Sequence, residues 1–78
     1  MKKSKHTLRE FVVCINNSNY PASLELHKIY QVVRDEEASL EGDIRVIDES
    51  GENYLYPSSY FVPIQVPHSV EESLLKAF

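Results

Sequence analysis

Few side chains in this sequence are placed to do chemistry: one cysteine, three histidines and many carboxylates. Cys14 lies within an apolar stretch, where a half-buried thiol behaves as an inert small hydrophobe. The histidines, His6, His27 and His68, are far apart, and none has the spacing to Cys14 that a zinc site uses. No Gly-x-Ser-x-Gly motif and no glycine-rich phosphate loop occurs. We therefore expect no enzyme activity, no metal and no cofactor.

The carboxylates gather in two segments. Asp35, Glu36 and Glu37 form a charge run, which is typical of a solvated loop. The segment 48–52 contains Gly51 and is too short for a calcium loop, so it predicts a tight hairpin turn. We expect both segments to be acidic and exposed.

Residues 54–61 combine aromatic side chains with a proline and two serines, in the order Tyr-Leu-Tyr-Pro-Ser-Ser-Tyr-Phe. The proline fixes φ and the serines can bond to nearby backbone, so this run predicts a single tight 3-10 turn. Because tyrosine is enriched where proteins bind one another, we take Tyr20, Pro57 and Tyr60 as a candidate binding face. The alternative is that these rings pack against the edge of the fold or against a C-terminal helix.

Length and charge set the class of protein. Seventy-eight residues make one domain with a small core. The net charge of −4 is uneven, because residues 1–10 hold four of the eight Lys and Arg and only one acid. We expect residues 1–9 to be a flexible basic arm. The acidic remainder repels phosphate backbones, so a nucleic-acid ligand is less favoured than a protein partner.

Location follows from hydropathy and cysteine content. No apolar run approaches the roughly 18 residues that span a bilayer, and the basic N-terminus is not followed by a signal-peptide hydrophobic region. A single cysteine cannot form an intramolecular disulfide, which fits a reducing compartment. We expect a cytoplasmic protein that makes no contact with a membrane.

Five short segments have the composition of β-strands: residues 11–15, 28–34, 43–48, 53–56 and 61–66. Alternation predicts that Tyr30 and Val32 point inward and Gln31 outward. Leu24 and Leu26 would share a face if their segment is extended. Pro63 lacks an N–H, so the last strand must lie at a sheet edge or carry a bulge.

Two segments have helical features. The acidic connection 35–42 suffices for a helix of no more than a turn or two. At the C-terminus, the spacing of Val70, Leu74 and Ala77 predicts a helix of about ten residues within 67–78. A helix of that length is not stable alone, so its apolar side must rest on the rest of the chain or on a partner. Self-association through this helix stays open.

Leu55-Tyr56-Pro57-Ser58-Ser59-Tyr60-Phe61 resembles the last-turn signature of Src-homology-3 (SH3) domains, in which an aromatic or aliphatic residue precedes Pro-Ser-Asn-Tyr-Val. Residues 24–32 are similar to the second strand of that family, and the resemblance covers residues 11–66. The chain also resembles small bacterial proteins with this barrel and no established role.

The resemblance implies a mainly β fold: a five-stranded SH3-like barrel at 10–66, with a 3-10 turn before the last strand, and then the C-terminal helix. It also implies that Tyr56 belongs to the core, with Pro57 and Tyr60 on a groove face. The peptide groove is incomplete, because residues 13–17 lack the family's Ala-Leu-Tyr-Asp-Tyr run and the chain has no tryptophan. The motif thus indicates how a barrel closes rather than proline-peptide recognition.

We expect a non-catalytic protein–protein interaction module, or a small regulatory or adaptor subunit, with an acidic surface. Its binding residues would be Tyr20, Pro57 and Tyr60. Two segments, Asp35 to Glu37 and residues 48–52, would form an acidic rim that steers a basic or apolar partner protein; the rim acids named as site residues are Asp35, Glu36 and Glu37. Two alternatives stay open: an acidic inhibitor that mimics nucleic acid, and a small barrel that binds nucleic acid.

Overall fold

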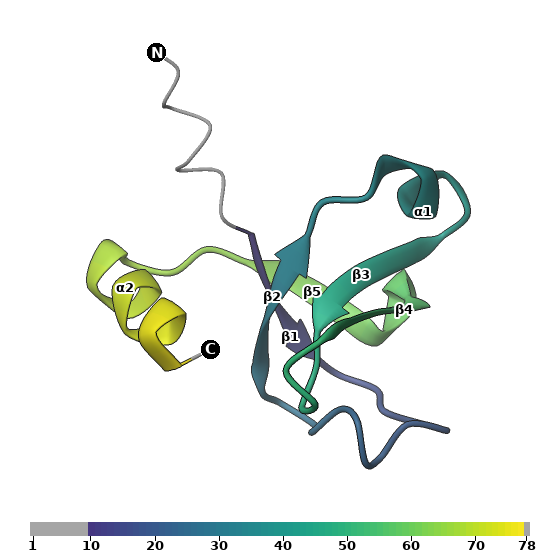
Figure 1. Cartoon of the computed structure of the whole chain (residues 1–78), viewed down its shortest axis with the longest axis horizontal. Coiled ribbons are helices and arrows are strands. Elements are labelled where there is room, and N and C mark those ends of the chain that lie inside the picture. Colours follow the sequence, from purple (N-terminus) through teal and green to yellow (C-terminus); the bar gives the residue numbers. More distant parts are fainter. Residues whose placement is uncertain (1–9, 78) are drawn as a thin grey trace.

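A computed structural model describes residues 10–77, in which five strands, two α-helices and a 3-10 turn follow one another (Figure 1). The strands are β1 (Phe11–Cys14), β2 (Ile29–Val33), β3 (Asp43–Ile47), β4 (Asn53–Pro57) and β5 (Phe61–Ile64). The helices are α1 (Glu36–Leu40) and α2 (His68–Ala77), and the 3-10 turn is η2 (Ser58–Tyr60). The mainly β fold, the 3-10 turn before the last strand and the C-terminal helix are confirmed. The basic arm expected at 1–9 lies outside the described residues.

The strands form one antiparallel sheet in the order β4-β3-β2-β1-β5. β2 joins its two parts, because residues 29–31 pair with β1 whereas Val32 and Val33 pair with β3. β4 and β5 are the two ends of the order and do not pair with each other, so the sheet is open.

Pro63 lies in β5, an edge strand of the sheet, which is one of the two positions that the sequence predicts for it. The amide of Ile15 donates to the carbonyl oxygen of Tyr60 at 2.8 Å, so these two residues form a hydrogen-bonded pair between β1 and β5. Because such pairs alternate along an antiparallel ladder, the backbone N–H and C=O groups of Val62 and Ile64 point toward β1, and those positions of Pro63 point away from it. The missing N–H of Pro63 therefore removes no hydrogen bond between β1 and β5. It also leaves the exposed edge of β5 with one donor fewer for pairing with another strand.

The core lies on one face of the sheet. Its buried members are Val12, Cys14, Leu24, Tyr30, Val46, Tyr56 and Phe61, with Val32, Ile44 and Tyr60 packed against them. The inward direction of Tyr30 and Val32 is confirmed, and so is the place of Tyr56 in the core. Phe11, on the opposite face of β1, is only 3% exposed, so both faces of this strand are covered.

The segment 15–28, between β1 and β2, is a series of turns and not a strand. Leu24 is fully buried whereas Leu26 is 44% exposed, so the two leucines do not share a face. The local reason is that the Leu24 amide turns back to bond the Tyr20 carbonyl at 3.0 Å, and that Leu26 and His27 form the next turn, in which the Lys28 amide bonds the Glu25 carbonyl at 3.4 Å. Consecutive turns leave no extended segment in which side chains could alternate.

The helices lie at different sides of the sheet. Figure 1 shows α1 at the end of the sheet opposite to the 15–28 segment, and α2 set to one side of the strands. On α2, Leu74 and Leu75 are half-buried and Val70 is 38% exposed, so its apolar side is only partly covered. Neither helix of the described part has the length and hydropathy of a membrane-crossing segment.

Candidate functional site

Of the reactive side chains named by the sequence, Cys14, His27 and His68 lie within the described residues and His6 lies outside them. Cys14 is fully buried, and its Sγ donates to the carbonyl oxygen of Asn16 at 3.3 Å. Burial raises the pKa of the Cys14 thiol, which keeps it protonated at neutral pH. His68 lies exposed on α2, with its ring nitrogens 3.8 Å from Glu71 and 3.2 Å from Glu72. Within residues 10–77, no three His, Cys, Asp or Glu side chains are arranged to hold a metal ion.

The hairpin after β3 is built around Asp48, which is 6% exposed, so the expectation of a wholly exposed acidic turn is wrong there. Asp48 Oδ1 accepts from the Ser50 amide at 2.9 Å and from Ser50 Oγ at 2.6 Å. Its Oδ2 accepts from the Tyr56 hydroxyl at 2.5 Å. Burial raises the pKa of Asp48, but the hydrogen bonds from Ser50 and Tyr56 outweigh burial and leave this pKa below its ordinary value. Burial and the Asp48 carboxylate raise the pKa of Tyr56 to about 12.

Glu49 ties the same hairpin to the 15–28 segment. Its Oε2 accepts from Lys28 Nζ at 2.7 Å and from the Tyr30 hydroxyl at 2.5 Å. The Tyr30 hydroxyl accepts in turn from the Glu25 amide at 2.7 Å. Lys28 and Tyr30 together hold the pKa of Glu49 below its ordinary value, while burial and Glu49 raise the pKa of Tyr30. These bonds fix the loop that carries Tyr20.

Three tyrosines meet beside this hairpin. The Tyr20 ring packs edge-on against Tyr56, with centroids 4.9 Å apart, and lies 6.2 Å from the ring of Tyr60. The Tyr60 hydroxyl donates to the Ser18 carbonyl at 2.9 Å, which anchors the loop from its other side. Tyr20 and Tyr60, predicted to share a face, are therefore brought together, and half-buried Pro57 follows Tyr56 at the end of β4.

A hollow of about 370 Å³ opens between Tyr20 and β4, lined by Tyr20, Ser23, Asp48, Ser50, Tyr54, Leu55 and Tyr56. Tyr20 is 39% exposed and Tyr54 is 51% exposed. We call Tyr20, Tyr54, Tyr56 and Tyr60 the tyrosine face. The sequence analysis missed Tyr54, although its spacing of two from Tyr56 on one strand indicates a shared side.

Only part of the predicted acidic rim lies beside Tyr20: Asp48 of the 48–52 segment lines the hollow with Tyr20, whereas the Asp35 to Glu37 part lies elsewhere. Asp35 is the N-cap of α1, where its Oδ1 accepts from the Ala38 amide at 3.1 Å, and its Oδ2 lies 2.9 Å from Arg45 Nε. The Ala38 amide and the Arg45 guanidinium hold the pKa of Asp35 below its ordinary value. Glu36 and Glu37 are exposed in the first turn of α1, at the opposite end of the sheet from the loop with Tyr20 (Figure 1).

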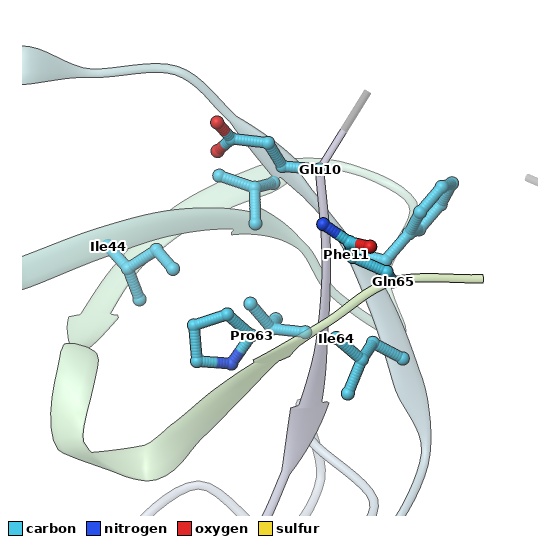
Figure 2. A pocket seen from close by; sticks show the side chains of 8 residues that line it. Glu10, Phe11, Ile44, Pro63, Ile64 and Gln65 are labelled. Atoms are coloured by element: carbon cyan, nitrogen blue, oxygen red, sulfur yellow. The ribbon is translucent and has the colours of Figure 1, made fainter. Parts of the chain in front are cut away.

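A second opening lies near α1. A groove of about 570 Å³ is lined by Glu10, Phe11, Val12, Val32, Ile44, Pro63, Ile64 and Gln65. Figure 2 shows Ile44 and Pro63 on one side of β1, with Phe11 and Ile64 on the other. A neighbouring hollow of about 270 Å³ shares Glu10, Val32 and Ile44 and extends to Asp35, Glu36 and Ser39. We call the two together the β5–α1 groove. The sequence carried no signal for it, because its walls come from distant segments.

Comparison with known proteins adds no relative: no protein-family model matches the chain, and neither a curated protein nor a solved structure is significantly similar to it.

Proposed function

We propose that this chain is a small SH3-like barrel that acts without catalysis, as a module or adaptor subunit that binds another protein through the tyrosine face. The order of elements supports the fold part of this proposal: a first strand, a long loop, a second strand, a hairpin, a 3-10 turn and a last strand. That order agrees with the resemblance of residues 55–61 to the last turn of SH3 domains.

The exposure of aromatic rings around a hollow carries the binding proposal. Tyr20 and Tyr54 each leave more than a third of their surface in solvent, and both line the 370 Å³ hollow. Tyrosine combines a large apolar area with a polar tip and has few side-chain rotamers to fix, so it suits protein recognition. The loop with Tyr20 is held by Tyr30, Glu49 and Tyr60, so the walls need little reordering when a partner binds.

The charge of the surface indicates the kind of partner. Residues 10–77 contain four Lys or Arg, and three of them are paired: Lys28 with Glu49, Arg34 with Glu10 and Arg45 with Asp35. Beside the tyrosine face, the exposed Glu52 accepts from the Tyr54 hydroxyl at 3.4 Å. We therefore propose a protein partner with basic and apolar side chains, rather than nucleic acid.

We place the protein in the cytoplasm as part of this proposal. Cys14 is a free thiol within the core, and a chain with a single unpaired cysteine gains nothing from an oxidising compartment.

The test compares partner capture by the wild-type chain and by the Tyr20→Ala and Tyr54→Ser variants, with proteins from the native host identified by mass spectrometry. Leu40→Ser is the matched control, because Leu40 is an apolar side chain that is 87% exposed on α1, away from the face. For a purified partner, we expect each tyrosine variant to bind about tenfold more weakly and the control to bind as wild type. A partner retained equally by all four proteins would refute the role of the tyrosine face.

A further inference from the structure

The β5–α1 groove has an apolar floor that the tyrosine face does not use. Val32 and Ile44 are half-buried and pack against the core, and the exposed Pro63 lies on the same side of β1 as Ile44 (Figure 2). The groove volume of about 570 Å³ is within the range of roughly 300–1,000 Å³ typical of ligand sites. It can therefore take a side chain of the size of leucine with part of its backbone.

The edge of β5 restricts how a chain can lie in this groove. An extended segment that added to β5 as a sixth strand would need the outward N–H groups of that edge. Pro63 occupies an outward-facing backbone position and has no N–H to donate. A segment in the groove must therefore be recognised through its side chains and not by strand addition.

The rim toward α1 supplies negative charge. Glu10 and Glu36 face the same guanidinium group, that of Arg34, at 3.6 and 3.9 Å. All three side chains are more than half exposed, so these ion pairs are weak and open readily. Arg45, the other cation of the rim, is already engaged by Asp35 and Asn53 at 2.9 Å each. The backbone of Glu10 is fixed, because its carbonyl accepts from the Val32 amide at 2.8 Å.

We propose that the β5–α1 groove is a second protein-binding site, which takes an extended segment with an aliphatic side chain next to a lysine or arginine. The aliphatic side chain enters between Ile44 and Pro63, and the cation replaces Arg34 between Glu10 and Glu36. The match of an apolar floor to an acidic rim selects this partner chemistry. The site is separate from the tyrosine face and does not depend on it.

The test uses three capped hexapeptides titrated into the isotopically labelled full chain and followed by amide chemical shifts. The first is Gly-Lys-Leu-Leu-Lys-Gly. The second replaces both lysines by glutamate, and the third replaces both leucines by serine. We expect the first to shift the amides of Val12, Val32 and Ile44 at lower concentration than either of the others, and to leave those of Tyr20 and Tyr54 in place.

Charge-reversed variants identify the rim. The pair Glu10→Lys and Glu36→Lys, made together, should weaken binding of the first peptide about fivefold, the size expected for two exposed ion pairs. The control pair Glu37→Lys and Glu41→Lys changes the net charge by the same amount at exposed positions that do not line the groove, and should leave binding unchanged.

Three outcomes would overturn the proposal. The first is a shift map centred on the tyrosine face, and the second is an equal loss of binding in both charge-reversed pairs. The third is a set of groove shifts that depends on protein concentration without peptide, which would assign the groove to a second copy of the chain. Because the tyrosine variants are separate proteins, failure of the groove leaves the proposed function standing, and failure of the tyrosine face leaves the groove standing.

Discussion

The dipeptides Asp48-Glu49 and Asp35-Glu36 have the same sequence and both follow a strand, but their aspartates differ in burial and in hydrogen-bond partners. Asp48 is buried and accepts from Tyr56, and Glu49 accepts from Tyr30. Asp35 caps the five residues of α1, and the Glu36 side chain is 83% exposed. The difference lies in the donors around each carboxylate. The Tyr56 hydroxyl holds Asp48 in the core and the Tyr30 hydroxyl anchors the partly exposed Glu49, whereas Arg45 holds the partly exposed Asp35 at the end of α1.

The largest effect should follow from Asp48→Ala. This substitution leaves the buried Tyr56 hydroxyl without its carboxylate acceptor, and it also removes the acceptor of the amide and hydroxyl of the exposed Ser50. We expect a loss of about 3 kcal/mol in the free energy of unfolding, measured by urea denaturation. The matched change, Asp35→Ala, should cost clearly less. Equal losses would show that Asp48 is as dispensable as a surface cap.

High pH should separate the two dipeptides, because only the first has tyrosine partners. The pKa of Tyr56 is raised in the folded state from 10.0 to about 12, so its contribution to stability is complete below pH 10 and is lost as pH rises toward 12. The urea midpoint should decrease over this pH range, and the decrease should be smaller in Tyr56→Phe. In Asp35→Ala the midpoint should decrease with pH as much as in the wild type. A decrease in Tyr56→Phe as large as that of the wild type would contradict the role given to the Tyr56 hydroxyl.

Low pH should affect both dipeptides in the same direction. The folded-state pKa values of Asp48, Glu49 and Asp35 are all lowered, so their stabilisation is present above ordinary values of 3.8 to 4.5 and is lost as pH falls below them. We expect a lower urea midpoint at pH 3 than at pH 7, with a smaller difference in Asp48→Asn. A midpoint that does not change between these values would show that the carboxylates make no net contribution.

A smaller effect is expected at the cap of α1. Asp35→Ala removes the acceptor of the Ala38 amide and the partner of Arg45, for a loss of stability smaller than that of Asp48→Ala. Asp35→Ser restores a capping oxygen without the charge, and should recover more than half of that loss in the same denaturation assay. If serine recovers nothing, the ion pair with Arg45 and not the cap holds this segment.

The smallest effect should come from Glu37→Gln. Glu37 is exposed, and its carboxylate forms no ion pair with any other described residue. We expect a change within about 0.5 kcal/mol in the free energy of unfolding. A larger change would mean that the surface charge of α1 acts on the fold over a distance, and could be checked by repeating the measurement at high salt.

The sequence was informative where a single residue restricts the backbone. Pro63 predicted an edge strand, and Gly51, with a φ of 86°, predicted the hairpin turn. Alternation gave the inward side of β2 correctly. It failed at Leu24 and Leu26, because this segment folds as consecutive turns that alternation of residue type does not reveal. The candidate site was recovered in part: Tyr20 and Tyr60 meet, whereas Asp35, Glu36 and Glu37 lie at the far end of the sheet.

The sequence by itself determined the number and type of elements, because residue preferences, prolines and glycines act within a few neighbours. It also determined the acidic character of the chain, since charge does not depend on fold. Only the tertiary structure decided that Asp48 is buried and Glu49 anchored, because that depends on the Tyr56 and Tyr30 hydroxyls reaching these carboxylates. It likewise created the hollow at the tyrosine face and the β5–α1 groove, whose walls join residues that the chain keeps tens of positions apart.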